Sequence, residues 1–289
     1  MTMTSTFPRL GTTVSRLGFG GAAIGLTNYL GDYAAGSPAA RAAAVDAIRA
    51  ARAGGLTYFD TAPGYGKGLS EEILGEALAG ERDIIVATKV PQASLAEVRR
   101  SAEASLARLK RTRLDLLQIH GTSLTLEAMT AIRAPGGTLD QLVRLREEGL
   151  VAAIGFTSED NNGAVYELIS SGAFDTMQIA YNLLLQHPCE PTRPFGSLFE
   201  AKKRGLFTIA MRGLTSGIFQ RWIRLANPAD RFDYSAALIQ FVLSNPLIDV
   251  ALVGMRTPEE VRANLAIWGD EAGRIDIEAL WSRYPTPVS

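Results

Sequence analysis

A short apolar segment followed by a helical pattern recurs eight times along the chain. Continuous apolar strands that alternate with helices are typical of a parallel sheet with both faces covered. Eight such units within 289 residues predict an α/β fold in which the sheet closes into a (β/α)8 TIM barrel. The apolar segments read LGFG, LTYFD, DIIVATK, LDLLQIH, AAIGFT, TMQIAY, FTIAM and VALVG.

The segments between the strands carry signals of turns and helix ends. FPRLGTTVS, before the first strand, predicts an N-terminal β-hairpin. Ser37 and Pro38 suit the N-cap and first turn of a helix that ends at Gly54. Capping boxes from Ser94 to Glu97 and from Thr138 to Gln141 predict two further helix starts. Later helices are expected near residues 161–171, 197–204, 234–244 and 257–267.

The composition restricts the classes of partner. Apolar residues make up 47% of the chain, and no linker or low-complexity segment divides it, so we expect a single domain over residues 1–289. The net charge of −1 implies no basic surface for nucleic acid or anionic lipid. The N-terminus lacks a signal-peptide pattern, polar residues interrupt the apolar window 236–254, and Cys189 is the only cysteine. These features predict a cytoplasmic protein that does not span a membrane.

Polar side chains follow the apolar strands at the points where the strands end. In a (β/α)8 barrel the carboxyl ends of the strands form the rim that carries the active site. Six residues that lie at or just past these ends are therefore expected to converge on one mouth. They are Asp60, Lys89, His120, Thr157, Tyr181 and Arg212.

Asp60, Tyr65, Lys89 and His120 form the candidate catalytic set. A free tyrosine has a pKa near ~10, so it is a poor acid at neutral pH unless a cation lies beside it. Lys89 is placed to supply that charge, Asp60 to hold the ammonium, and His120 to orient a carbonyl oxygen or relay a proton. Taken singly, each residue also has an ordinary structural reading, such as a strand-end ion pair or a buried histidine. Together they predict a site that protonates an oxygen as it becomes an alkoxide.

Other chemistries fit the sequence poorly. Two histidines, His120 and His187, and one cysteine provide no zinc-ligand spacing, so no metal is expected. The chain also lacks the G-x-S-x-G elbow of a serine hydrolase. A site that protonates an oxygen then needs a source of electrons, and hydride from a nicotinamide is the simplest.

Two segments bear on how such a cofactor is held. GFGGAA, residues 18–23, matches a loose dinucleotide fingerprint, but a loop rather than a long helix follows it, so we do not assign a Rossmann fold. The segment GMRTPEEVRANL places Thr257 at an N-cap, Pro258 at the first helical position and Glu260 at the capping-box position. The free N–H groups there, with Arg256 just upstream, predict a phosphate site.

At these residues the sequence resembles an aldo-keto reductase over nearly its whole length. The shared segments are LGFGG, DTAPGYGKGLSEEILG, TKV, QIH, GFTS, MQIAYN and GMRTPEEVRANL. GFGGAAIG and YGKGLSE further resemble a bacterial branch that includes aldose and pyridoxal dehydrogenases. The resemblance implies a catalytic tetrad with Tyr65 as the proton donor, made of Asp60, Tyr65, Lys89 and His120.

The resemblance also implies a set of cofactor contacts, to which Asp60 also belongs. They are Gly21 and Ala22 at the nicotinamide ribose, Thr157, Ser158 and Gln178 at the carboxamide, Met211 at the nicotinamide ring, Arg212, Leu214 and Ser216 along the pyrophosphate, and Gly254, Arg256, Glu260 and Asn264 around the adenosine. Two positions depart from the family pattern. GFTS replaces the usual Ser-Asn pair, so Ser158 cannot donate as an amide would. AMRGL stands where the family has an aromatic residue or arginine and then a proline.

The expected function is NAD(P)(H)-dependent hydride transfer to or from a small aldehyde, ketone or sugar-like carbonyl, with a pocket shaped by residues 121–137, 215–230 and 281–284. NADP(H) is favoured over NAD(H) because the guanidinium of Arg256 can bind a 2′-phosphate bidentately. Two alternatives remain open. One is a non-catalytic, cofactor-binding regulatory barrel, and the other is a phosphosugar lyase or isomerase that uses Lys89 as a Schiff base. The sequence does not identify the substrate, the reaction direction or the oligomeric state.

Overall fold

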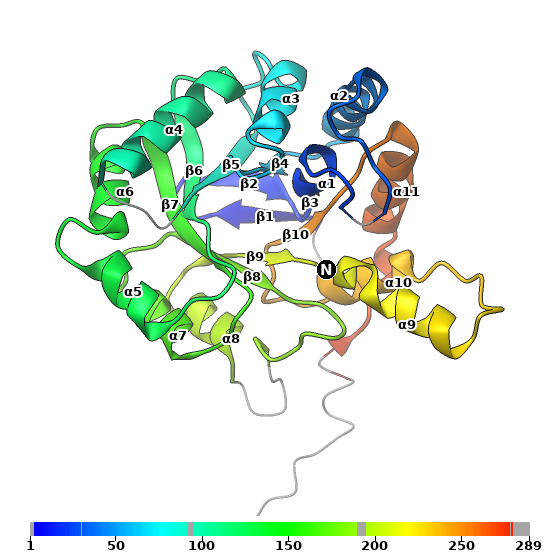
Figure 1. The fold of residues 1–289 in the computed structure, drawn as a ribbon. Helices are drawn as coiled ribbons and strands as arrows, with labels where there is room; N and C mark the ends of the chain where they lie inside the picture. Colours follow the sequence, from blue (N-terminus) through cyan, green and yellow to red (C-terminus); the bar gives the residue numbers. More distant parts are fainter. Residues whose placement is uncertain (1–2, 30, 92–94, 190–194, 278, 280–289) are drawn as a thin grey trace, which may run out of the picture.

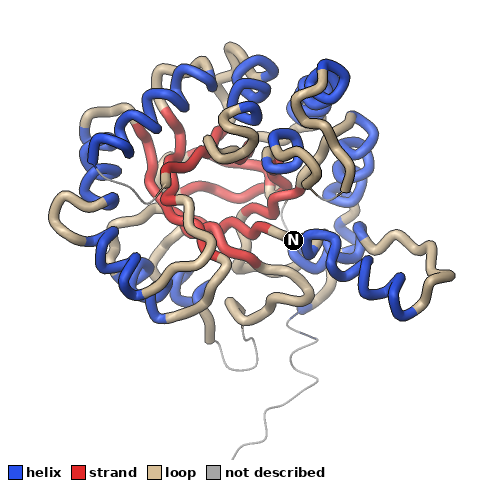
Figure 2. The backbone as a smooth tube through the Cα atoms, in the orientation of Figure 1, coloured by secondary structure: helices blue, strands red, loops and turns tan. Residues whose placement is uncertain are grey.

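A closed barrel of eight parallel strands forms the centre of the computed structural model, which describes residues 3–29, 31–91, 95–189, 195–277 and 279. Figure 2 shows the strands as an inner ring with helices around it. The predicted (β/α)8 barrel and N-terminal hairpin are confirmed. In order around the barrel the strands are β10 (Val250–Val253), β3 (Leu17–Gly20), β4 (Tyr58–Asp60), β5 (Ile85–Val90), β6 (Leu114–Ile119), β7 (Val151–Ser158), β8 (Thr176–Ala180) and β9 (Phe207–Met211).

Helices lie between successive strands and cover the outside of the barrel (Figure 1). The start of α2 agrees with the sequence, because the Ser37 side chain accepts a hydrogen bond from the N–H of Ala40 and Pro38 is the first helical residue. Thr257 caps α11 in the same way through the N–H of Glu260. The helices are α1 (Ala22–Gly25), α2 (Pro38–Ala53), α3 (Leu69–Ala77), α4 (Leu95–Leu109), α5 (Leu126–Arg133), α6 (Thr138–Glu147), α7 (Gly163–Ser170), α8 (Ser197–Lys203), α9 (Ile218–Ala226), α10 (Ser235–Leu243) and α11 (Pro258–Gly269).

The structure corrects several helix assignments. The capping box at Thr138 is wrong, because Gly137 is the N-cap and Gln141 donates its side-chain amide to the carbonyl of Gly136. Ser94 of the other predicted box lies outside the described residues. Helices α1, α5 and α9 occupy segments for which no helix was predicted. None of the residues of α9 is buried, and Figure 1 shows this helix projecting beyond α10. The apolar residues Ile218, Phe219, Trp222 and Ile223 do follow a helical period, so the pattern for this helix was present in the sequence and was overlooked.

The N-terminal hairpin closes one end of the barrel. Strand β1 (Thr4–Phe7) pairs antiparallel with β2 (Thr12–Ser15), and the fully buried ring of Phe7 stacks on Phe207 with 4.6 Å between centroids. Phe207 is the first residue of β9, so the hairpin covers the amino ends of the strands. The carboxyl ends are left as the accessible mouth.

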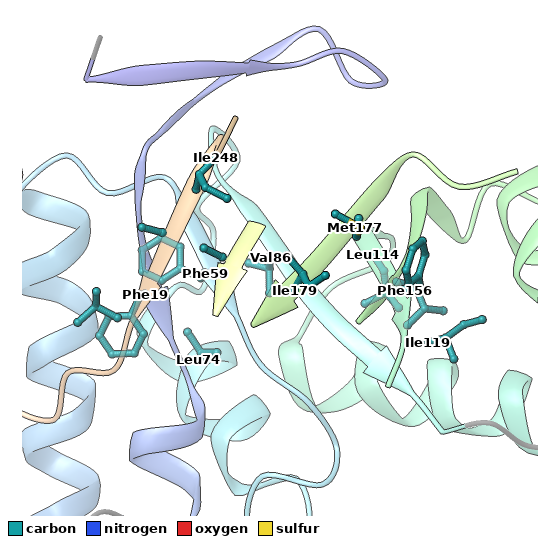
Figure 3. Close-up of a cluster of buried hydrophobic side chains, with 14 of the residues drawn as sticks. Phe19, Phe59, Leu74, Val86, Leu114, Ile119, Phe156, Met177, Ile179 and Ile248 are labelled. Carbon is teal, nitrogen blue, oxygen red and sulfur yellow. The ribbon is translucent and has the colours of Figure 1, made fainter. Parts of the chain in front are cut away.

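Successive side chains of each strand alternate between the barrel interior and the layer of helices. Tyr58, Ile85 and Ala87 belong to the interior apolar cluster, whereas Phe59 and Val86 belong to the cluster between strands and helices. Figure 3 shows part of this outer cluster, including Phe59, Val86 and Leu74 of α3. Because the period along a strand is two, the next inward positions on β4 and β5 are Asp60 and Lys89.

Candidate active site

A cavity of about 650 Å³ opens at the carboxyl ends of the strands. All four residues of the predicted catalytic set and most of the predicted cofactor contacts line it. These residues are Asp60, Tyr65, Lys89, His120, Ala22, Thr157, Gln178, Met211, Arg212, Leu214, Ser216, Gly254, Arg256, Glu260 and Asn264. The fold therefore brings together residues that span more than 240 positions of sequence.

Three of the predicted rim and cofactor-contact residues do not line the cavity. On β7, Thr157 points inward, so Ser158 points outward, where its hydroxyl accepts a hydrogen bond from the N–H of Asp160 (3.0 Å). Gly21 turns its α-carbon toward Asp60 and Ser70, and a Cβ there would lie 2.6 Å from atoms of both. Tyr181, which was expected at the mouth, is buried and stacks on Phe241 of α10. The strand period explains Ser158 and Tyr181, since both have outward parity.

Asp60 and Lys89 form a buried ion pair at the floor of the cavity. The Lys89 ammonium donates to both carboxylate oxygens of Asp60 and to the carbonyl of Thr61, each at 2.7 Å. Burial alone would lower the pKa of Lys89, but the charges and hydrogen bonds of Asp60 and Tyr65 outweigh burial and raise it. Lys89 is therefore a fixed cation at neutral pH.

Tyr65 lies in the turn between β4 and α3, against Lys89 and His120. The ammonium nitrogen of Lys89 is 5.0 Å from the centroid of the Tyr65 ring, and the His120 ring meets the phenol edge-on at 5.8 Å. Burial raises the pKa of Tyr65, and the charge of Lys89 opposes this by lowering it. The net shift is upward, so the phenol carries its proton at neutral pH and is available as a donor.

His120 follows β6, and its backbone N–H donates to the carbonyl of Val90 (2.7 Å). Burial, and then the charge of Lys89, lowers the pKa of His120 to about 4. The imidazole is consequently neutral at pH 7, with one nitrogen able to donate and the other able to accept. A neutral imidazole beside the phenol suits the orientation of a carbonyl oxygen.

Polar side chains next to this set are already hydrogen-bonded to the protein. The Thr157 hydroxyl donates to the carbonyl of Gly121 (2.8 Å) and accepts from its N–H (2.9 Å). The Gln178 carbonyl oxygen accepts from the side-chain amide of Gln118 (2.9 Å), and the Gln178 amide contacts the sulfur of Met211 (3.6 Å). These bonds fix the orientations of Thr157 and Gln178 in the cavity wall.

The far end of the cavity, at the N-terminus of α11, carries Arg256. Its guanidinium donates to the carbonyl of Ala23 (2.9 Å) and to that of Tyr29, and it lies 4.0 Å from the centroid of the Tyr33 ring. The Glu260 carboxylate accepts from the backbone N–H of Arg256 (2.6 Å), one residue before the cap. Glu260 is therefore engaged near its own helix terminus, but at Arg256 rather than at the N-cap Thr257 that a capping box would use. The contacts of Arg256 with Ala23 of α1 and with Tyr29 of the loop after α1 were not foreseen.

A second arginine, Arg212, lies at the mouth of the cavity. Arg212 pairs with Glu159 at 2.5 Å, and its backbone adopts a left-handed conformation with φ of 60°. Glu159, Leu26, Tyr29 and Asp233 line the cavity but were missed from the sequence. Glu159 could have been found because it directly follows β7, while the other three lie in loops without a periodic pattern. Of the predicted pocket loops, Gly121, Thr122 and Ser216 contribute to the lining, and the tail at 281–284 lies outside the described residues.

Within the described part of the chain, no group of three or more His, Cys, Asp or Glu side chains could hold a metal ion. Among the same residues, no helix is both long and apolar enough to cross a membrane.

The family model described as "Aldo/keto reductase family" matches residues 16–239. The chain belongs to this family. It is 28% identical to the aldo-keto reductase YhdN of Bacillus subtilis, over 90% of this chain and 86% of the relative. It is also 28% identical to the D-threo-aldose 1-dehydrogenase of a Pseudomonas species, over 99% and 100% of the two chains. An aldo/keto reductase from Klebsiella pneumoniae, solved in complex with NADP and acetate, has a TM-score of 0.73 at 23% identity, covering 100% of this chain and 98% of that one.

Proposed function

We propose that this aldo-keto reductase transfers hydride between a nicotinamide and the carbonyl carbon of a small aldehyde, ketone or sugar-like substrate, with Tyr65 as general acid and base. The observation that carries the proposal is the grouping of a buried Asp60–Lys89 pair, a protonated phenol and a neutral His120 around one cavity. When bound, the nicotinamide supplies or accepts the hydride.

Side chains of the protein would transfer the proton to and from the substrate oxygen. In reduction, Tyr65 donates its phenolic proton to the oxygen as negative charge develops there, and it takes a proton back in oxidation. The tyrosinate that forms is stabilised by the adjacent ammonium of Lys89, which Asp60 holds in place. His120, being neutral, donates a hydrogen bond to the same oxygen and orients the carbonyl.

The cavity also has features that suit a dinucleotide. It extends from the tetrad to the first turn of α11, and its wall passes Gly254, where a Cβ would lie 2.8 Å from the Cβ of Ala23. Because Gly254 has no side chain, the backbone itself forms the cavity wall at this point. Leu214 and Ser216 lie between the two ends, and Asn264 and Glu260 lie at the far one.

For the cofactor, we favour NADP(H), with NAD(H) as the second possibility. Arg256 at the start of α11 is the candidate for the 2′-phosphate, and the structural neighbour from Klebsiella pneumoniae holds NADP. The similarity to a D-threo-aldose 1-dehydrogenase supports a sugar-like substrate. The single cysteine, Cys189, is buried, in keeping with a cytoplasmic setting.

The alternative functions receive less support. A Schiff-base lysine must be neutral to attack a carbonyl, but Lys89 is paired with Asp60 and its pKa is raised. A regulatory barrel without turnover would have no use for the grouping of Tyr65 with Lys89 and His120.

One assay tests the proposal directly. A panel of small aldehydes, ketones, aldoses and polyols is followed at 340 nm with each of the two dinucleotides. We expect turnover with at least one carbonyl–alcohol pair and a higher kcat/KM with the phosphorylated dinucleotide. Tight dinucleotide binding without turnover of any substrate would instead support the regulatory barrel. Borohydride trapping of a substrate on Lys89 would support the lyase.

A further inference from the structure

Glu71 is a fully buried carboxylate that does not line the cavity. It lies in the first turn of α3, and none of its surface is exposed. One carboxylate oxygen accepts from the hydroxyl of Thr88 (2.6 Å) and the other from Nε of Arg108 (2.6 Å). A buried charge is costly unless it is paired and hydrogen-bonded. Both oxygens of Glu71 meet this requirement, and the two donors come from different elements, β5 and α4.

The first donor is next to a catalytic residue. Thr88 and Lys89 are consecutive on β5, so their side chains point to opposite faces of the sheet. Lys89 enters the cavity and Thr88 faces α3. A bond from Thr88 to Glu71 therefore holds β5 at the position from which Lys89 projects.

The helix that carries Glu71 is joined to the turn that carries Tyr65. The backbone N–H of Ser70 donates to the carbonyl of Tyr65 (3.2 Å). The Ser70 hydroxyl donates to the carbonyl of Gly21 (2.9 Å) and accepts from the hydroxyl of Thr61 (2.8 Å). The start of α3 thus fixes the Tyr65 turn against the ends of β3 and β4.

Arg108 of α4 contacts both Glu71 and the residue that precedes α3. Gly68, the residue before α3, has φ of 97°, and a Cβ there would lie 2.6 Å from Cδ of Arg108. The arginine side chain packs over this left-handed glycine while its guanidinium pairs with Glu71. Only a residue without a side chain leaves room for this contact.

We propose that Glu71 is a positioning residue that sets the separation between the Tyr65 phenol and the Lys89 ammonium through its bond to Thr88. The inference rests on the proposed role of Tyr65 as proton donor. The Lys89 nitrogen lies 5.0 Å from the Tyr65 ring centroid, and the interaction of a charge with a buried group falls as their separation grows. If the bond from Thr88 is lost, β5 keeps its pairing with β4 and β6 but loses its side-chain bond to α3. The separation between Lys89 and Tyr65 is then less tightly set, and Lys89 stabilises the tyrosinate less.

Thr88→Val tests this with little change of shape, since it removes the donor but leaves the Glu71–Arg108 pair intact. We expect kcat to fall roughly tenfold, equivalent to about 1.4 kcal/mol less stabilisation of the transition state, with the dinucleotide Kd unchanged. Thr88→Ser, which keeps the hydroxyl, should recover most of the rate. Thr208→Val is the matched control, because the buried Thr208 hydroxyl bonds the carbonyl of Leu247 and the carboxylate of Asp249 near the opposite end of the barrel. It should lower Tm without changing kcat.

A second measurement does not depend on turnover. The protein is labelled with [¹³C]tyrosine, and the Tyr65 signal, assigned by its loss in Tyr65→Phe, is titrated by NMR. The charge of Lys89 lowers the pKa of Tyr65, so Thr88→Val should move this titration to higher pH, while Thr208→Val should not. An unchanged titration in Thr88→Val would overturn the inference, as would equal losses of kcat in the two valine variants. An inactive wild-type enzyme would refute the proposed function, and the titration would still decide the role of Glu71.

Discussion

The two ends of the cavity are built differently. At the reaction end, Lys89 and Asp60 are buried, and the ammonium is bonded on three sides at 2.7 Å. At the other end, the side chain of Arg256 is bonded to the carbonyls of Ala23 in α1 and Tyr29 in the loop that follows, and at the mouth Arg212 is partly exposed and paired with Glu159. In the proposed reaction, the reaction end would need no rearrangement before it stabilises developing charge. The end proposed to hold the dinucleotide would have to exchange its existing bonds for phosphate contacts, so substitutions there should have smaller effects.

The largest effect is expected from Tyr65→Phe. Removal of the phenolic hydroxyl removes the proton donor but not the ring that packs beside His120. We expect kcat to fall by roughly 10²-fold or more, the typical size of a general acid–base contribution. Dinucleotide Kd, measured by fluorescence quenching, should stay within about twofold of wild type, a free-energy change below about 0.5 kcal/mol. Near-normal turnover in this variant would eliminate Tyr65 as the acid.

Lys89→Met should also lower kcat strongly. Together with a double variant, it distinguishes the role of the Lys89 charge in turnover from the role of the ion pair in stability. The single variant leaves the buried Asp60 carboxylate without its cation, although Gln178 still hydrogen-bonds it; breaking a buried ion pair costs about 3–5 kcal/mol of stability. The double variant Asp60→Asn/Lys89→Met removes both charges, so it should recover much of the lost stability in urea unfolding. It should not recover kcat, because the tyrosinate still lacks its cation. Recovery of turnover together with stability would mean that the ion pair serves only the fold.

The placement of Asp60, Lys89 and Thr157 in one cavity could be predicted because the signals for it are local. The strand period places Asp60, Lys89 and Thr157 inward, and the same period would have placed Ser158 and Tyr181 outward had it been applied to them. The eight strands were recognised for the same reason, as continuous apolar runs. The contacts of Arg256 with Ala23 of α1 and with Tyr29 of the following loop join positions more than 220 residues apart. No pattern in a single sequence encodes such a contact.

His120 provides a pH test of the reaction end. Its pKa is lowered to about 4 by burial and by the charge of Lys89, so the imidazole should remain neutral from pH 8 down to about pH 5. We expect its NMR signal, assigned with His120→Gln, to titrate near pH 4, where protonation should reduce kcat by adding a second cation beside Lys89. A titration near the ordinary value of about 6.5 would show that Lys89 and burial do not control this residue.

Arg256→Ala addresses the dinucleotide end. A charge-assisted phosphate contact is worth about 1.5–3 kcal/mol, or one to two decades of affinity. Because the arginine must first give up its bonds to the Ala23 and Tyr29 carbonyls, we expect a loss in NADP(H) affinity at the lower end of this range, about tenfold. NAD(H) affinity should change little. Equal losses for both dinucleotides would mean that Arg256 holds the loop rather than reading the 2′-phosphate.

The smallest expected effect, Glu159→Gln, has the opposite sign. In the free protein the Glu159 carboxylate pairs with Arg212 at 2.5 Å, and both side chains line the cavity. An anionic ligand must compete with this carboxylate for the guanidinium, so its neutralisation should tighten dinucleotide binding. Because the pair is partly exposed, the gain should be about two- to fivefold, corresponding to about 0.4–1 kcal/mol, and it should shrink as salt screens the charges. Glu148→Gln is the matched control, since Glu148 pairs with Arg99 on the outside of the barrel. If the two variants bind the dinucleotide equally, the Arg212 pair does not oppose binding, and the contrast between the two ends of the cavity then rests on Arg256 alone.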